Sequence, residues 1–234
     1  MNDEFAKELA RQLPVKDIYA DAGKAAARQA GQLFEDIVKT LQLALAPLQV
    51  VGAYQDRFRE FLDRSVRRVP EDQRISPAPQ ILGPVLEGVR YEPEGTPIDE
   101  MFSQLLSCCM DSGRVDKAHP SYPIIIKQLS SDEAKVLKSL RNAKYRFVRV
   151  HHFKDGMSYA GDIEVDELPR DTLQFPGNVS FYMAHLRRLG LASLYETRPQ
   201  QPIFVDGHQT GTRTFSEYRL SDVGRRFIEA CIPA

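Results

Sequence analysis

Residues 185–191 read HLRRLGL, and this stretch decides how the second half of the chain is interpreted. Leu186 and Leu189 repeat with Val179 and Tyr182 at intervals of three or four residues, which predicts the buried face of a helix, and Leu191 is expected to lie inward with them. Gly190 predicts where that helix ends, because glycine readily adopts the left-handed conformation found at helix C-termini. We expect the chain to turn from there directly into a strand of a β-hairpin.

The elements expected on either side of this helix follow a definite order. The sequence SSDE at 130–133 is a good N-terminal cap with early carboxylates. It predicts that a helix begins here, upstream of the helix that ends at Gly190. A strand- and loop-rich insert, residues 145–177, separates the two helices. Strands are expected near 193–197 and 215–220, and Ser221 is expected to cap a last helix. This is the order of a winged-helix domain elaborated in its middle.

The first half of the chain, residues 1–129, is expected to be helical. Apolar side chains advance by three or four positions along one face, at Ile18, Ala22, Ala26, Ala30, Leu33, Ile37 and Leu41. Residues 70–97 are rich in proline and predict a linker or irregular cover, with a short helix near 81–89. We therefore expect a mainly α fold, with an N-terminal helical hairpin or bundle over 1–129 and an α+β winged-helix-like domain over 130–234.

The charge of the chain sets limits on its partners. A net charge of −1 gives no general attraction to nucleic acid or to an anionic membrane. Residues 1–129 carry 16 Lys and Arg against 19 Asp and Glu, whereas residues 130–234 carry 15 against 13. The second half is therefore close to neutral, and any nucleic-acid site must be a local patch.

Cysteine use and hydropathy predict a cytoplasmic protein. Cys108, Cys109 and Cys231 are odd in number and lack the spacing of a disulfide framework, which favours a reducing compartment. The N-terminus is charged and has no apolar signal-peptide core. The most apolar stretch, residues 41–54, is shorter than the roughly 20 residues that a spanning helix needs.

The outward face of the helix before Gly190 is the candidate binding site. Arg198 and Arg213, in the expected hairpin, would add phosphate contacts if the domain read DNA. The near-neutral charge and an outward Phe181 favour protein docking instead. The candidate macromolecule-binding residues are Ser180, Phe181, His185, Arg187, Arg188, Arg198 and Arg213.

We find no pattern that predicts catalysis or cofactor binding. His151 and His152 lack the further ligands of a zinc site, so no metal is expected. Cys108 and Cys109, with His119 nearby in sequence, lie among apolar residues and are expected to be inert thiols. Phosphate loops, GxGxxG, GxSxG and HExxH are absent from the sequence. A non-enzymatic protein with no cofactor and no small-molecule substrate is the expectation.

Several stretches, taken in order, resemble the abortive-infection alpha (Abi-alpha) family of bacteria. They lie at 17–48, 69–91, 101–140, 185–194 and 218–232, and the run LL…MD…HPS…IIKQLS…EA within 101–140 is the most diagnostic. The insert at 145–177 lies outside the stretches that match. The resemblance implies a part in defence against phage, in which an infected cell stops growing or dies. It implies no catalytic residues.

Three functions follow as hypotheses. The first is a non-enzymatic phage-defence or accessory protein that binds another macromolecule, a protein partner or a second copy before any other. The second is a winged-helix DNA-binding regulator that uses Arg187 and Arg188. The third is a membrane-acting effector that inserts the Ala/Gly-rich helix 17–54, which the charges of Glu35, Asp36 and Lys39 disfavour.

Overall fold

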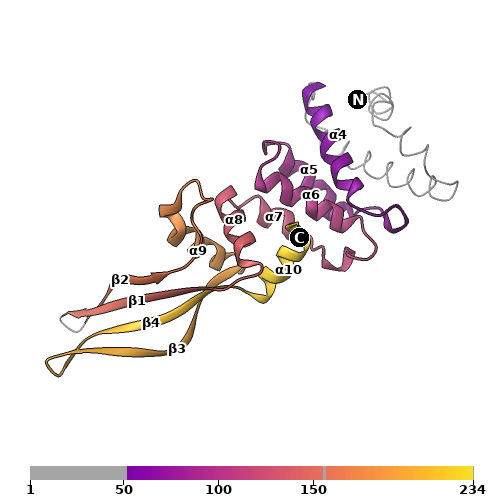
Figure 1. The fold of residues 1–234 in the computed structure, drawn as a ribbon. Helices are drawn as coiled ribbons and strands as arrows, with labels where there is room; N and C mark the ends of the chain where they lie inside the picture. Colours follow the sequence, from indigo (N-terminus) through magenta and orange to yellow (C-terminus); the bar gives the residue numbers. More distant parts are fainter. Residues whose placement is uncertain (1–51, 155–156, 234) are drawn as a thin grey trace. The chain divides into compact units, whose positions relative to one another are not determined.

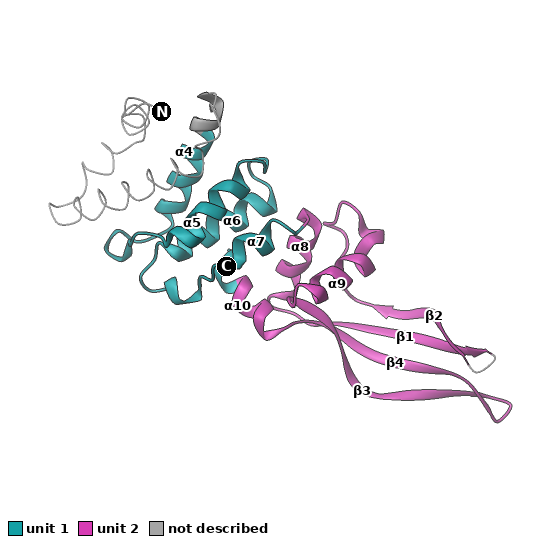
Figure 2. Ribbon diagram, turned by 180° about the vertical axis from the view of Figure 1, so that it is seen from behind, with its two compact units in different colours: residues 1–129, 229–234 teal, residues 130–228 magenta. Residues whose placement is uncertain are grey.

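The computed structural model describes residues 52–154 and 157–233. The chain forms two compact units, shown in Figure 2: unit 1 is residues 1–129 with 229–234, and unit 2 is residues 130–228. The apolar stripe expected over 18–41 and almost all of the helix expected over 17–54 lie outside the described residues. In the part that the structure describes, no helix is long and apolar enough to cross a membrane.

Unit 1 is built around helix α6, Pro97–Cys109, whose apolar side chains are fully buried. Thr96 caps this helix by accepting a hydrogen bond from the Asp99 amide. Its neighbours are α4 (Gly52–Arg67), α5 (Pro79–Val89) and α7 (Tyr122–Ile126), and the short 3-10 turns are η1 (Glu71–Gln73) and η2 (Val115–Lys117).

Two kinds of contact hold the helices of unit 1 together. The approach of α5 to α6 is so close that a Cβ on Gly88 would lie 2.3 Å from the Phe102 ring. The contact of α4 with α6 is partly polar, since buried Asp99 accepts a 2.7 Å hydrogen bond from Arg64 and Ser65 lies 2.9 Å from Ser103. Within the proline-rich segment, α5 begins at Pro79, where the missing N–H does no harm.

Unit 2 contains helices α8 and α9, the first part of α10, and a four-stranded antiparallel sheet of order β2-β1-β4-β3. Figure 1 shows its two hairpins extending away from helices α8 and α9. The central strands β1 and β4 pair from Tyr145 opposite Tyr218 to His152 opposite Gly211. The elements are α8 (Ser131–Leu140), β1 (Tyr145–Lys154), β2 (Met157–Asp166), η3 (Pro176–Asn178), α9 (Val179–Arg188), β3 (Ala192–Val205), β4 (His208–Leu220) and α10 (Asp222–Cys231).

The expectation of a mainly α chain, with an N-terminal helical bundle and a winged-helix-like C-terminal domain, is wrong: the fold is α+β. The insert over 145–177 holds two ten-residue strands, and β3 and β4 run for 14 and 13 residues. The outer halves of these strands extend past the helices and are mostly exposed, so they lack the alternation that reveals a half-buried strand. Register shifts along β1–β2 and β3–β4 interrupt the alternation further.

Helix α9 ends as the sequence predicts. Gly190 has a φ of 71°, and the Leu191 amide donates a 2.9 Å hydrogen bond back to the Leu186 carbonyl. Leu191 then accepts a bond from the Ser221 amide, which brings the start of α10 against the end of α9. A Cβ on Gly224 would lie 1.9 Å from the Leu191 carbonyl oxygen, so this contact requires glycine.

We predict that Gly224→Ala lowers the free energy of unfolding by about 2 kcal/mol or more, because backbone must move to admit the methyl group. Urea denaturation of the full chain followed by circular dichroism measures the change. Gly177→Ala is the matched control, since no atom lies within 4 Å of a Cβ at that position. Equal stabilities for the two variants would contradict the close approach of α10 to Leu191.

Candidate functional site

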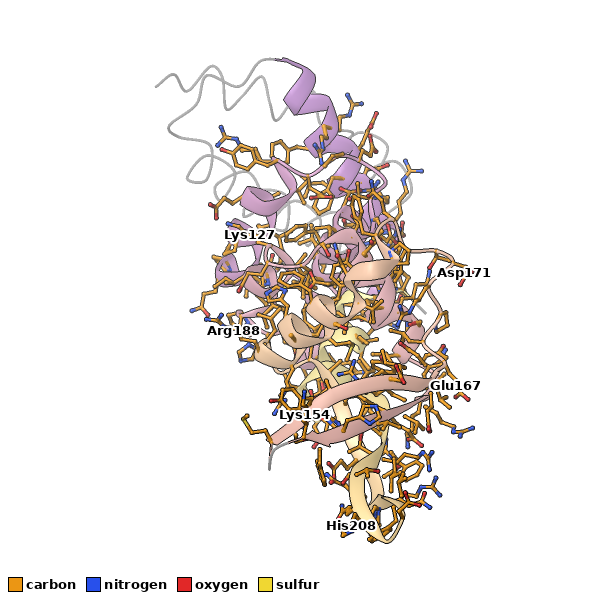
Figure 3. The ribbon with its side chains drawn as sticks, turned by 90° about the vertical axis from the view of Figure 1, so that its left-hand side faces the viewer. Lys127, Lys154, Glu167, Asp171, Arg188 and His208 are labelled. Carbon is orange, nitrogen blue, oxygen red and sulfur yellow. The ribbon has the colours of Figure 1, made fainter. Side chains whose placement is uncertain are left out.

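The exposed surface of α9 carries an aromatic ring in the first turn of the helix and two arginines at its end. Phe181 is 68% exposed, and its ring stacks on His185 with 6.3 Å between centroids. Arg187 and Arg188 are exposed further along the helix, and Figure 3 shows Arg188 at its outer side. Phe175, 56% exposed, lies just before η3. We call these five residues, together with exposed Ser180, the α9 surface.

Asp132, a buried carboxylate in the first turn of α8, holds the segment that leads into α9. It accepts hydrogen bonds from the amides of Gln174 (2.9 Å) and Phe175 (2.8 Å) and from the Tyr182 hydroxyl (3.1 Å). Burial alone would raise the pKa of Asp132, but these bonds and the Lys135 ammonium outweigh it and hold that pKa below its ordinary value. The ionised carboxylate therefore fixes the backbone that presents Phe175.

Glu133, the next residue, fixes the other aromatic side chain. One of its oxygens accepts bonds from the Ser130 amide (2.8 Å) and hydroxyl (2.9 Å), which completes the capping box of α8. The other lies 2.7 Å from Nδ1 of His185. This hydrogen bond ties the His185 ring to the first turn of α8. The His185 imidazole, on which the Phe181 ring stacks, is thus held by the buried Glu133 carboxylate.

Arg187 and Arg188 keep their charges free. Within the described residues neither has a carboxylate at ion-pair distance, whereas five other arginines of unit 2 do: Arg146, Arg170, Arg213, Arg219 and Arg225. Cations suit the C-terminal turn of a helix, so both arginines also stabilise α9 itself. The α9 surface consequently combines exposed aromatic area with unpaired positive charge.

The structure does not bring the remaining candidates to this surface. Arg213 donates two hydrogen bonds, of 2.6 and 2.7 Å, to Glu164 on β2, so its charge is already paired. The Arg198 guanidinium lies 3.4 Å from the centroid of the Phe215 ring. At about 3.3 Å per residue, Arg198 lies roughly 20 Å along β3 from Ala192.

The structure also gives the surroundings of the cysteines and histidines considered in the sequence. Burial raises the pKa of the Cys108 thiol to about 11 and also raises that of Cys109, so both are protonated near neutral pH. His119 bonds to Ser121 two residues away, as a turn cap does. His151 and His152 lie on β1, and the described residues hold no cluster of three or more metal-ligating side chains.

Unit 1 has an open hollow of about 390 Å³, but its charges are satisfied locally. It is lined by Arg68, Glu100, Gln104, Asp111, Arg114 and Pro233. Arg68 pairs with Glu100 at 2.6 Å, and Arg114 pairs with Asp111 at 2.6 Å. A hollow whose cations and anions already neutralise one another offers a ligand little, and the α9 surface is the stronger candidate.

In a comparison with known protein families, the profile described as abortive infection alpha matches residues 51–231. The chain belongs to the abortive infection alpha family. The resemblance noted in the sequence is thereby confirmed, although the stretch at 17–48 lies outside the matched residues. No curated protein and no solved structure matches the chain. Membership in this family connects the protein with abortive infection and assigns no role to a particular residue.

Sequence reasoning missed one residue of the α9 surface and the two carboxylates that support that surface. Phe175 was assigned to a loop, and no periodicity marks an exposed aromatic residue there. Asp132 and Glu133 were interpreted only as helix-start carboxylates, which is what two acids after a cap serine usually are. Their partners in the segment before η3 and on α9 lie between 42 and 52 residues further along the chain, so no local pattern reports them.

We predict that Asp132→Asn lowers the free energy of unfolding by about 2 kcal/mol at pH 7, because hydrogen bonds to a charged acceptor are lost. The folded pKa lies below the ordinary value of about 3.9, so the stabilisation is full above that value and disappears as the pH falls through the folded pKa. The difference between wild type and variant, measured by urea denaturation, should therefore shrink below about pH 4.

Asp171→Asn is the control, since Asp171 is an exposed acid in the same connecting segment. It should leave stability within about 0.5 kcal/mol of wild type. A difference between Asp132→Asn and wild type that stays constant down to low pH would contradict an ionised anchor.

Proposed function

We propose that this protein acts in abortive infection as a non-enzymatic binding protein, and that the α9 surface docks onto a protein partner. The observation that carries the proposal is the arrangement around Phe181. An exposed ring is held on His185, which buried Glu133 fixes, and two unpaired arginines follow six and seven residues further along the helix. This arrangement has the chemistry of an interface and lacks the chemistry of a reaction centre.

The composition of the α9 surface supports protein as the class of partner. Aromatic residues and arginine are enriched in protein interfaces, and such residues carry most of the binding energy when they lie near the centre. Side chains that are already fixed lose little conformational freedom on binding, so the buried Asp132 and Glu133 favour affinity. The free charges of Arg187 and Arg188 call for acidic groups on the partner.

The same contacts disfavour the alternative of a DNA-binding regulator. Phosphate contacts from the β3–β4 hairpin would need Arg198 and Arg213, which are engaged by Phe215 and Glu164. Phe181, a largely exposed aromatic residue of this face, offers no hydrogen bond to a base edge. The membrane-acting alternative depends on residues 17–54, nearly all of which lie outside the described part of the chain.

The proposal predicts that Phe181→Ala weakens partner binding by about 2 kcal/mol, or roughly 30-fold, as truncation of a central aromatic residue does. In a bacterial host that the wild-type protein protects, this variant should restore phage plating. Tyr91→Ala is the matched control, because Tyr91 is a 74% exposed aromatic residue in unit 1. It should leave protection intact.

A photo-crosslinking amino acid at the exposed position of Ser180 identifies the partner directly. In infected cells it should give a crosslinked protein that disappears when Phe181→Ala is added. Crosslinks to nucleic acid and to no protein would contradict the proposal. So would a Phe181→Ala variant that protects the host from phage as well as the wild type does. DNA affinity that falls steeply with salt and is lost in Arg187→Ala/Arg188→Ala would establish the regulator in its place.

A further inference from the structure

Unit 2 has a second exposed apolar group, at the end of the β3–β4 hairpin. Phe204 is 61% exposed and Val205 is 55% exposed, and they are followed by the turn residues Asp206 and Gly207. Both turn residues have positive φ, of 49° and 80°, as a tight two-residue hairpin turn requires. Successive strand residues point to opposite faces, so this tip is apolar on both sides and ends in a carboxylate. We call residues 204–208 the hairpin tip.

The hairpin tip and the α9 surface complement each other in chemistry. The tip offers two aliphatic or aromatic side chains and the Asp206 carboxylate, which has no ion-pair partner among the described residues. The α9 surface offers Phe181 and the two unpaired guanidinium groups of Arg187 and Arg188. Apolar contact flanked by an Asp–Arg pair is the usual composition of a protein interface.

These two sites cannot meet within one molecule. Strand β3 begins at Ala192, directly after α9, and runs 14 residues to the turn. At about 3.3 Å per residue, the tip is roughly 40 Å from the end of α9. Figure 1 shows the tip at the far end of the hairpin, and Figure 3 shows His208 there, well away from Arg188. Any contact between them joins two molecules.

We propose that the hairpin tip of one copy occupies the α9 surface of a second copy. Asp206 pairs with Arg187 and Arg188 of the other molecule, and Phe204 or Val205 packs against its Phe181. Since each copy carries both sites on one unit, a two-fold axis lets both contacts form at once and closes the pair as a dimer. The inference rests on the α9 surface being a protein-docking surface, and it implies that a target must displace the tip.

Charge exchange between the two sites tests the proposal. Analytical ultracentrifugation of the full chain should show a concentration-dependent dimer. Arg187→Glu/Arg188→Glu should be monomeric, because two glutamates would face Asp206, and Asp206→Arg should be monomeric because three cations would meet. The dissociation constant should rise at least tenfold in each case. Asp162→Arg, a charge reversal at an exposed acid of β2, is the control and should stay dimeric.

Mixing the two monomeric variants gives the sharper result. One contact then joins the α9 surface of the Arg187→Glu/Arg188→Glu variant, now negative, to the tip of the Asp206→Arg variant, now positive. The other contact is wild type on both sides. The mixture should therefore dimerise although neither variant does alone, which also shows that both are folded. A wild-type monomer at every concentration, or a mixture that stays monomeric, overturns the proposal.

The failure of this inference can be told apart from failure of the proposed function. If the wild-type chain is a monomer while Phe181→Ala still loses its crosslinked partner, the proposed function of the α9 surface is supported and self-association is ruled out. If the wild-type chain is a monomer and Asp206→Arg loses phage protection, the tip belongs to another partner and self-association again falls. Self-association is supported if the mixture of Arg187→Glu/Arg188→Glu with Asp206→Arg dimerises and neither variant dimerises by itself.

Discussion

Two adjacent carboxylates at the start of α8, those of Asp132 and Glu133, hold the α9 surface in place. Asp132 bonds to the backbone before η3 and to Tyr182, and Glu133 bonds to Ser130 and His185. A buried carboxylate is costly unless its oxygens accept hydrogen bonds, and both carboxylates have at least two such bonds here. These bonds fix the backbone at Phe175 and the His185 ring on which Phe181 stacks.

Charged side chains in unit 2 differ in whether they are already paired. Arg213 of the β3–β4 hairpin is neutralised by Glu164. Arg187 and Arg188 stay free at the end of α9, where the helix dipole favours them. A surface that keeps exposed aromatic area and unpaired charge together is suited to capture an acidic, partly apolar segment, and the chain itself carries such a segment at residues 204–208.

The sequence predicted what local rules govern. The SSDE cap, the end of α9 at Gly190 and the outward position of Phe181 follow from capping preferences and helical periodicity. The strand lengths could not be predicted, because strands that leave the core lose the alternation that marks them. Nor could the bond of Glu133 to His185, 52 residues apart, since only the folded chain brings those side chains together.

The central claim is that buried carboxylates fix the docking surface from within, and amide hydrogen exchange tests it most directly. In the free protein, the amides of Gln174 and Phe175 lie in an exposed segment yet donate to Asp132. They should exchange far more slowly than the amides of neighbouring Asp171 and Thr172. Protection of Gln174 and Phe175 confirms the claim, whereas exchange as fast as that of Asp171 contradicts it.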